Sequence, residues 1–198
     1  MPFSSKKARM RFMASVRCST EYAYDTRQYP SPEAPKASPG TSATCFCSSS
    51  RVQGVGDFLK ALPPMPDCWF TVVMPDYGVS TPEAFAAYDK VGSSRHPDCE
   101  AQEAAIRAED LAAVCAAAGN ALEECSGAKD NEAIKAALRE HGALTALMTG
   151  SGAAVFGIFA SEAEARTAAA ALKTRWPQVY VAQPDKGGAR VAAPKWML

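Results

Sequence analysis

A short run of small residues is the part of the sequence best suited to chemistry. Gly150-Ser151-Gly152 lies between two uncharged apolar runs, 143–148 and 153–159, each short enough to be a buried strand. The two glycines permit positive φ angles and a close approach of the backbone to a neighbour. On spacing alone, the run is most simply the turn of a hairpin. A second interpretation is that the turn offers backbone N–H groups to a ligand such as a phosphate.

The other residues with catalytic or metal-binding potential do not form groups. His96 stands alone in a loop, His141 stands alone at a helix end, and Cys45-Phe46-Cys47 has no second pair to complete a zinc site. The sequence therefore predicts no metal site, and spacing assigns no catalytic residue. Seven cysteines without CxxC spacing favour a reducing compartment over a disulfide framework.

Composition excludes several classes of partner. The formal net charge is zero, and residues 51–198 hold 14 basic and 18 acidic residues, so we expect no basic face and no nucleic-acid partner. No apolar run approaches the roughly 18 residues of a membrane span, and no secretory signal is expected. The bacterial cytoplasm is the expected location. A plastid is the alternative, because Lys and Arg are mixed with Ser in the first 17 residues.

The elements that hold the glycine turn follow from periodicity and cap signals. Strands are predicted over 68–74, 143–148, 153–159 and 179–182. Helices are predicted over 81–90, 103–124 with a break at Gly119-Asn120, 131–142 and 161–176. The order strand, helices, strand, strand, helix, strand is the split βαβ plan with extra helices in the first crossover. We therefore expect an α+β, ferredoxin-like antiparallel sheet with helices on one face.

The first 51 residues differ from the rest of the chain. Ser, Thr, Pro and charged residues dominate, and Pro30, Pro32, Pro35 and Pro39 fall within ten residues. Such a segment cannot bury enough apolar surface to offset the entropy lost on ordering. The predicted organisation is a low-order arm over 1–51, disordered or non-native, a domain over 52–183 and a loose tail over 184–198.

Three runs of sequence share their order and spacing with one family. They are Gly-Val-Gly-Asp at 54–57 with Leu-Pro-Pro-Met-Pro at 62–66, Pro-Asp-Tyr-Gly-Val-Ser-Thr-Pro-Glu-Ala-Phe at 75–85, and Met-Thr-Gly-Ser-Gly-Ala-Ala-Val-Phe at 148–156, supported by Asn-Ala-Leu-Glu at 120–123. Together they resemble the C-terminal half of the 4-diphosphocytidyl-2-C-methyl-D-erythritol kinases, which are GHMP small-molecule kinases. The resemblance covers about residues 52–183.

The resemblance implies a reaction and the position of a site. The γ-phosphate of ATP, with Mg²⁺, would pass to the 2-hydroxyl of a cytidine-diphosphate-linked methylerythritol in the non-mevalonate route to isoprenoids. A turn beside the phosphate and substrate cleft would consist of Gly150, Ser151, Gly152 and Ala153, whose N–H groups can face developing negative charge. The substrate side would be bordered by Tyr77, Gly78, Val79, Ser80 and Thr81.

The chain departs from the family pattern in its first 51 residues. The family's glycine-rich ATP loop, its Pro-x-Lys-Ile-Asn pattern and its Gly-x-Asp-x-Pro-Phe run with the catalytic aspartate have no match there. No catalytic residue is carried over, since Lys6 and Lys7 lack the matching context and neither Asp57 nor Asp67 fits the aspartate run. A shifted reading frame, a misplaced start or a truncated gene would account for the change in composition near Val52. The expected function is an incomplete kinase copy. The alternative is a catalytically silent fragment or a small-ligand-binding ferredoxin-like module.

Overall fold

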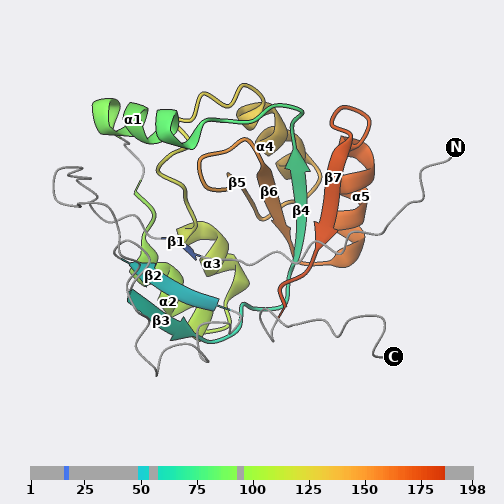
Figure 1. Ribbon diagram of the computed structural model, residues 1–198. Helices are drawn as coiled ribbons and strands as arrows, with labels where there is room; N and C mark the ends of the chain where they lie inside the picture. Colours follow the sequence, from blue (N-terminus) through green and yellow to red (C-terminus); the bar gives the residue numbers. More distant parts are fainter. Residues whose placement is uncertain (1–15, 18–48, 54–57, 93–95, 186–198) are drawn as a thin grey trace, which may run out of the picture.

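A four-stranded antiparallel sheet forms the centre of the domain (Figure 1). The computed structural model describes residues 16–17, 49–53, 58–92 and 96–185. The sheet contains β4 (Trp69–Met74), β5 (Thr145–Met148), β6 (Val155–Phe159) and β7 (Gln178–Ala182), in the order β5-β6-β4-β7. The first and third strands of this unit lie in the middle, as the split βαβ plan requires. The predicted fold class is therefore confirmed.

A small second sheet precedes the main one along the chain. It contains β1 (Val16–Arg17), β2 (Ser49–Gln53) and β3 (Phe58–Leu62), with β2 and β3 antiparallel. Strand β2 begins inside the segment predicted as a low-order arm. The turn predicted at 54–57 and most of the predicted arm and tail lie outside the described residues.

Helices cover both faces of the four-stranded sheet. Val73 of β4 packs with Ile134 of α4 (Asn131–Glu140) and Leu172 of α5 (Glu162–Leu172). Phe70 and Val72 of β4 pack instead with residues of α2 (Cys99–Arg107) and α3 (Leu111–Ala117). The expectation of helices on one face is therefore wrong. The reason is that β4 is apolar on both faces, a pattern typical of a strand covered on both sides.

The buried polar residue of β4, Thr71, has a hydrogen-bond partner within the core. Thr71 is fully buried, and its Oγ1 donates a hydrogen bond of 2.8 Å to the carbonyl oxygen of Ala165 in α5. A buried hydroxyl without such a partner would be destabilising. The bond therefore fixes how α5 sits on the sheet.

The predicted long helix over 103–124 is two shorter helices. Asp98 caps α2 by accepting from the Ala101 N–H at 2.9 Å, and Asp110 caps α3 by accepting from the Ala113 N–H at 3.0 Å. Between them Glu109 has a φ of 57°, which ends α2. This break was not predicted, and it arises because a side-chain cap outweighs the alanine-rich composition. The predicted break at Gly119-Asn120 is confirmed, since α3 ends at Ala117 and Ala118 is extended.

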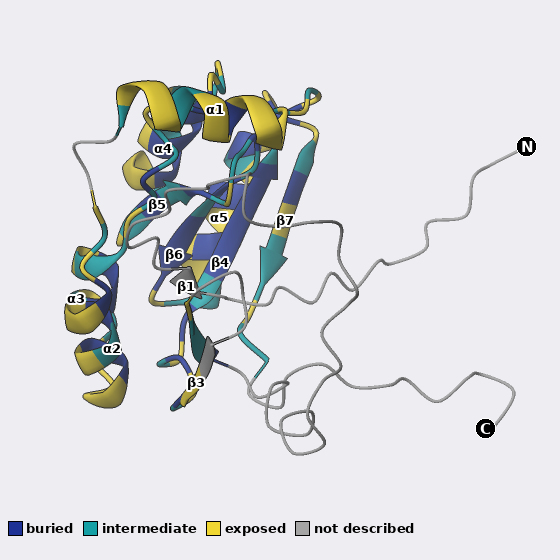
Figure 2. Ribbon diagram, turned by 60° about the vertical axis from the view of Figure 1, so that its left-hand side comes forward, coloured by how far each residue is buried: buried dark blue, intermediate teal, exposed yellow. Residues whose placement is uncertain are grey.

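The other predicted helices are present, although the one predicted over 161–176 ends at Leu172. Helix α5 follows Ser161, which accepts from the Glu164 N–H at 3.3 Å, and it buries Ala165, Ala169 and Leu172 as predicted. Helix α1 (Thr81–Val91) lies at the end of the sheet and is mostly exposed, with Ala84 as its buried residue (Figure 2). None of the described helices is long and apolar enough to cross a bilayer.

The described cysteines do not all behave alike. Cys68, Cys115 and Cys125 are free thiols, whereas Cys99 takes part in a disulfide. The expectation of reduced cysteines therefore applies to three of the four described ones. Burial raises the pKa of Cys68 to about 12 and that of Cys115 to about 11, so neither thiol is a nucleophile near neutral pH.

Candidate functional site

The glycine turn, residues 149–154, joins β5 to β6. Met148 pairs with Val155 across the two strands, so the hairpin prediction is confirmed. The Thr149 N–H donates to the Ala154 carbonyl at 2.9 Å, and the Gly152 N–H donates to the Thr149 carbonyl at 3.1 Å. Gly150 and Gly152 have φ angles of 58° and 98°, which is the conformation that favours glycine.

The two glycines of the turn face different surroundings. A Cβ on Gly152 would lie 2.9 Å from Met148 Sδ and 3.4 Å from Val79 Cγ2, so the absence of a side chain there serves packing. A Cβ on Gly150 would meet nothing within 4 Å, and Gly150 is exposed. In the described part of the chain, the N–H groups of Gly150 and Ser151 have no acceptor. The turn therefore has one packed side and one open side.

The segment predicted to border the substrate lies against this turn. The hydroxyls of Thr81 and Ser151 share a hydrogen bond of 2.8 Å, although they are 70 residues apart in sequence. Gly78, Ser80 and Thr81 are exposed, while Val79 packs beside Gly152. The two runs that were predicted separately thus meet at one end of the sheet.

Tyr77 differs from the rest of that segment. Its hydroxyl accepts a hydrogen bond of 2.9 Å from the backbone N–H of Asp130, which precedes α4. The side chain is half-buried. The hydroxyl of Tyr77 therefore fastens the segment to the start of α4.

Two residues that contact the turn were not assigned a role from the sequence. The side-chain amide of Asn120 donates to the carbonyl oxygens of Met148 and Gly150, both at 2.8 Å. The carboxylate of Glu123 accepts from the backbone N–H of Met148. The signal available in the sequence was the Asn-Ala-Leu-Glu run at 120–123, which supported the resemblance without indicating a contact with the turn.

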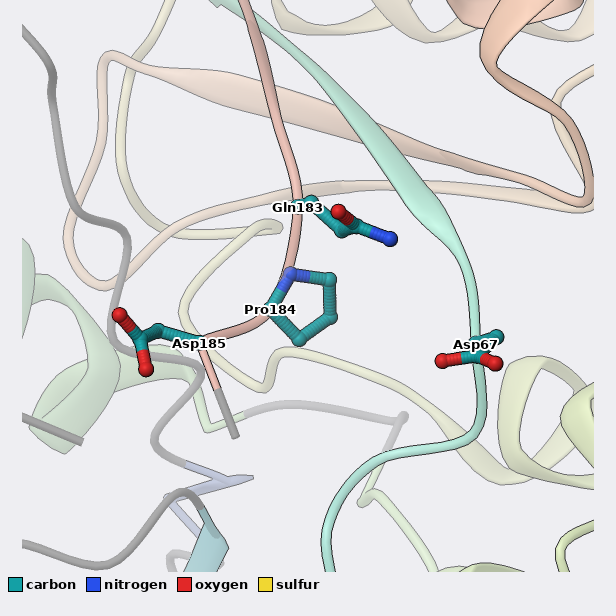
Figure 3. Close-up of a pocket in the computed structure, with 4 residues that line it drawn as sticks. All are labelled: Asp67, Gln183, Pro184 and Asp185. Atoms are coloured by element: carbon teal, nitrogen blue, oxygen red, sulfur yellow. The ribbon is translucent and has the colours of Figure 1, made fainter. Parts of the chain in front are cut away.

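Two hollows of the described structure bear on the choice of site. One of about 260 Å³ borders Asn120 and Glu123 and is also lined by residues 96–98. The larger one, of about 450 Å³, lies at the opposite end of the sheet from the glycine turn (Figure 3). There Asp67 and Asp185 lie on either side of Pro184. The larger hollow does not contain a residue predicted for the site, so its size does not make it the candidate.

The described residues offer little for metal binding. Among them, no group of three or more His, Cys, Asp or Glu side chains is placed to hold an ion. The chemistry of the turn is therefore that of backbone donors, small side chains and two hydroxyls. Such a surface can bind an anion and can let a bulky group approach the backbone.

Comparison with known proteins agrees with the fold. The family model for the C-terminal domain of GHMP kinases matches residues 102–178. The 4-diphosphocytidyl-2-C-methyl-D-erythritol kinase of Moorella thermoacetica is 39% identical over 134 residues, which are 65% of this chain and 47% of the relative. The Clostridium tetani kinase of the same name is 32% identical over 145 residues, 71% of this chain and 49% of that protein. The chain thus spans about half the length of the curated relatives it matches.

Solved structures show the same half-length match. A crystal structure of 4-(cytidine 5'-diphospho)-2C-methyl-D-erythritol kinase superposes with a TM-score of 0.55 at 28% identity, covering 69% of this chain and 48% of that one. A homoserine kinase from Cytophaga hutchinsonii superposes with a TM-score of 0.55 at 18% identity, covering 66% and 46%, which supports the fold alone. The chain therefore carries a C-terminal domain of the GHMP kinase family and resembles that half of the 4-diphosphocytidyl-2-C-methyl-D-erythritol kinases.

Proposed function

We propose that this chain supplies mainly the substrate-side domain of an ATP-dependent kinase for 4-diphosphocytidyl-2-C-methyl-D-erythritol, with the glycine turn beside its phosphate and substrate cleft. The observation that carries the proposal is the open side of the glycine turn, where Gly150 is exposed and two backbone N–H groups lack an acceptor among the described residues. The likeness to kinases of that name supplies the substrate class. Since many functions share one fold, the turn supports the proposal more than the sheet does.

The proposed reaction moves one phosphoryl group. The bond between the γ-phosphorus and the bridging oxygen of ATP breaks, a bond to the 2-hydroxyl oxygen forms, and the hydroxyl proton passes to a base. Such a transfer depends mainly on positioning and on stabilising charge on the phosphoryl oxygens. The N–H groups of Gly150 and Ser151 would donate to those oxygens, and Gly152 and Ala153 would keep bulky side chains away from the approach.

The fit differs for the two implied cofactors. The phosphates of ATP suit the turn, because nothing lies within 4 Å of the position where Gly150 would carry a Cβ. Mg²⁺ would neutralise charge on the phosphates when bound. The described residues do not form a cluster of three or more metal-ligating side chains, so we assign no Mg²⁺ ligand to this domain.

We place the cytidine-diphosphate-linked substrate beside residues 77–81. Ser80 and Thr81 are exposed, and the hydroxyl of Thr81 already contacts Ser151 of the turn. A substrate held there would have its acceptor hydroxyl close to a phosphate on the turn. This short separation is what an in-line transfer requires.

A catalytically silent, small-ligand-binding module is the second candidate. The observation that favours it is that residues 1–198 contain no match to the family's ATP loop or to its aspartate run. Without a base and a nucleotide loop, the turn can bind a phosphate but cannot complete the transfer.

A chimera separates the two candidates. The N-terminal half of the Moorella thermoacetica kinase is fused to residues 49–185 of this chain, and ADP release is measured with ATP and the cytidine substrate. The first candidate expects turnover by the chimera and none by this chain alone. Substrate binding by the chimera without turnover would favour the silent module.

A matched pair of substitutions tests the role of the turn in that chimera. Asn and Asp both tolerate the φ of 58° at Gly150, and they differ in charge. We expect Gly150→Asp to raise the KM for ATP about tenfold above that of Gly150→Asn, because a carboxylate repels the phosphates. Equal KM values for the two variants would contradict a phosphate-facing turn.

A further inference from the structure

We infer that Asn120 and Glu123 are positioning residues that hold the glycine turn in its open conformation, with Lys135 fixing Glu123. The inference concerns the shape of the turn. Its consequence for catalysis rests on the proposed function. Neither residue lies on the sheet, and both belong to the irregular segment between α3 and α4.

The first observation is the position of β5 at the edge of the sheet. An edge strand presents every second residue's N–H and C=O groups away from its neighbour. At Met148 both outward groups are bonded to side chains, the N–H to Glu123 and the C=O to Asn120. Two residues before Met148, the outward carbonyl of Ala146 accepts a hydrogen bond of 3.3 Å from Arg139 of α4. Side chains therefore cover the edge of β5 next to the turn.

The second observation is that both hydrogens and the oxygen of the Asn120 side-chain amide take part in hydrogen bonds. Its nitrogen has two hydrogens, and it donates to two carbonyl oxygens, those of Met148 and Gly150. Its oxygen accepts from the Leu122 N–H at 3.0 Å. The amide thus joins the last residue of β5 to the first glycine of the turn. No other polar side chain of similar size could donate twice and accept once in that place.

The third observation is the charge of Glu123. One carboxylate oxygen accepts from Met148, and the other lies 2.9 Å from Lys135 Nζ. The side chains of Glu123 and Lys135 are 9% and 4% exposed. An unpaired carboxylate so close to the turn would repel an anion there, and Lys135 neutralises it. Lys135 also pairs with Glu132 at 2.7 Å, but that carboxylate is 81% exposed and is screened by water. The buried ion pair therefore lets Glu123 orient the backbone with a cation beside it.

These residues and Thr81 contact different parts of the hairpin. Asn120 bonds the carbonyls of Met148 and Gly150, whereas Thr81 bonds the Ser151 hydroxyl. Gly152 is packed against Met148 and Val79 from within. The peptide units that carry the N–H groups of Gly150 and Ser151 are thus held by contacts at Met148, Gly150, Ser151 and Gly152.

The test uses the full chain and two substitutions of matched chemistry. Asn120→Asp keeps the size and the acceptor for Leu122 but sets an oxygen against two carbonyl oxygens. Gln183→Glu makes the same amide-to-carboxylate change at an exposed position at the far end of the sheet. Backbone hydrogen exchange is followed at Thr149 and Gly152, whose N–H groups bond within the turn, and at Val73 in the core.

We expect Asn120→Asp to speed exchange at Thr149 and Gly152 by about tenfold more than at Val73. We expect Gln183→Glu to leave the exchange rates of Thr149 and Gly152, relative to that of Val73, unchanged. A general loss of stability would speed exchange at all three residues alike. Equal acceleration at Val73 would therefore overturn the inference. Unchanged exchange at Thr149 and Gly152 would overturn it as well.

Rescue by a conservative change provides the second readout. Glu123→Gln retains an oxygen that accepts from Met148, whereas Glu123→Ala removes it. We expect the Gln variant to keep most of the protection at Thr149 and the Ala variant to lose it. Equal loss in both would overturn the role assigned to the Met148 contact.

A titration with inorganic tripolyphosphate distinguishes failure of this inference from failure of the proposed function. We expect the amide signals of Gly150 and Ser151 to shift in the wild-type chain, and Asn120→Asp to weaken that binding about tenfold. If tripolyphosphate does not shift the amide signals of Gly150 and Ser151 in the wild-type chain while the exchange results are as expected, the positioning role stands and the proposed function fails. If tripolyphosphate binds both proteins equally, the phosphate-facing turn that the proposed function requires stands and positioning by Asn120 fails.

Discussion

Two nearly buried carboxylates hold two parts of the domain, and they do so by different means. Glu123 holds the glycine turn through a buried lysine and a backbone N–H. Glu103 on α2 holds the β2–β3 hairpin through Lys60 at 2.6 Å and Arg51 at 3.5 Å, and it also contacts Arg107 at 3.0 Å. The Glu103 side chain is 11% exposed, but Lys60 and Arg107 are 60% and 47% exposed.

The difference lies in access to water and salt. Exposed cations can be hydrated and screened, so each of their ion pairs contributes little. Lys135 is 4% exposed and also pairs with the exposed Glu132 at 2.7 Å, but Glu123 is 9% exposed, so removal of Lys135 leaves the Glu123 carboxylate as an uncompensated charge. The turn is therefore fixed by contacts that conditions in solution change little, whereas the hairpin is fixed by contacts that respond to pH and salt.

The largest expected effect is that of Lys135→Met. The substitution leaves the Glu123 carboxylate buried beside Met148 without a cation, at a cost of about 3 kcal/mol in the free energy of unfolding. The matched change on the other side is Lys60→Met, for which we expect about 0.5 kcal/mol because Lys60 is exposed. Urea denaturation of both variants measures the two values. Equal losses would remove the distinction between the two carboxylates.

The next effect is that of Gly152→Ala, which we expect to cost about 2 kcal/mol. The new Cβ would lie 2.9 Å from Met148 Sδ, at a backbone φ of 98° that alanine rarely adopts. Gly150→Ala is the control, since its Cβ would meet nothing within 4 Å, and we expect about 1 kcal/mol from its φ alone. Unfolding free energies by urea denaturation test the order. A larger loss at Gly150 would contradict the assignment of a packed side and an open side to the turn.

A smaller effect, and one that depends on pH, is expected for Glu103→Gln. Hydrogen bonds from Lys60 and then Arg107 lower the pKa of Glu103 to about 2, from an ordinary value of 4.5. A group whose pKa is lowered by folding stabilises the fold above its unfolded pKa and loses that contribution as the pH falls through its folded pKa. The difference in Tm between wild type and Glu103→Gln should therefore be full at pH 7, decrease below about pH 4.5 and vanish near pH 2.

Salt provides the control for that prediction. Raising the salt concentration should narrow the difference in Tm between wild type and Glu103→Gln at pH 7, because Lys60 and Arg107, which lie closer to Glu103 than the 16% exposed Arg51, are exposed. The effect of Lys135→Met should change little over the same range. A pH-independent Glu103→Gln difference would show that the carboxylate acts by packing and not by charge.

The smallest effect is expected for Thr81→Val. The Thr81–Ser151 hydrogen bond is exposed, so its loss should cost about 0.5 kcal/mol. A double-mutant cycle with Ser151→Ala isolates the coupling between the two hydroxyls. A coupling as large as the Lys135→Met effect would mean that this bond, and not the buried pair, holds the turn.

The sequence predicted the parts of the fold that depend on neighbouring residues. The strands around β4 and β6, the cap of α5 at Ser161 and the positive φ angles of Gly150 and Gly152 are local features. The break at Gly119-Asn120 was predicted, but the break between α2 and α3 was missed because alanine-rich periodicity does not locate a cap, and Asp110 supplies one. That helices pack on both faces of the sheet was not predicted, because it depends on long-range contacts between β4 and the helices.

In the candidate site, too, the local features were predicted and the long-range contacts were not. The sequence indicated both the turn and the segment 77–81, but not that Thr81 and Ser151 touch across 70 residues. Asn120 is 28 and 30 residues from the carbonyls it binds, and Glu123 is 25 residues from Met148. Contacts of this range leave no periodic pattern in one sequence. Local chemistry therefore identified the turn, and only the fold identified what holds it.

The strand order has a practical consequence at the end of the sheet away from the turn. Asp67, just before β4, and Gln183, just after β7, line the same hollow (Figure 3). The polypeptide thus approaches and departs from the four-stranded unit at neighbouring points. A pair of dyes attached at 67 and 183 would report cooperative melting of the unit as a change in energy transfer. Both labels would sit a full strand length from the residues under test, so the same labelled protein could serve every variant of the turn.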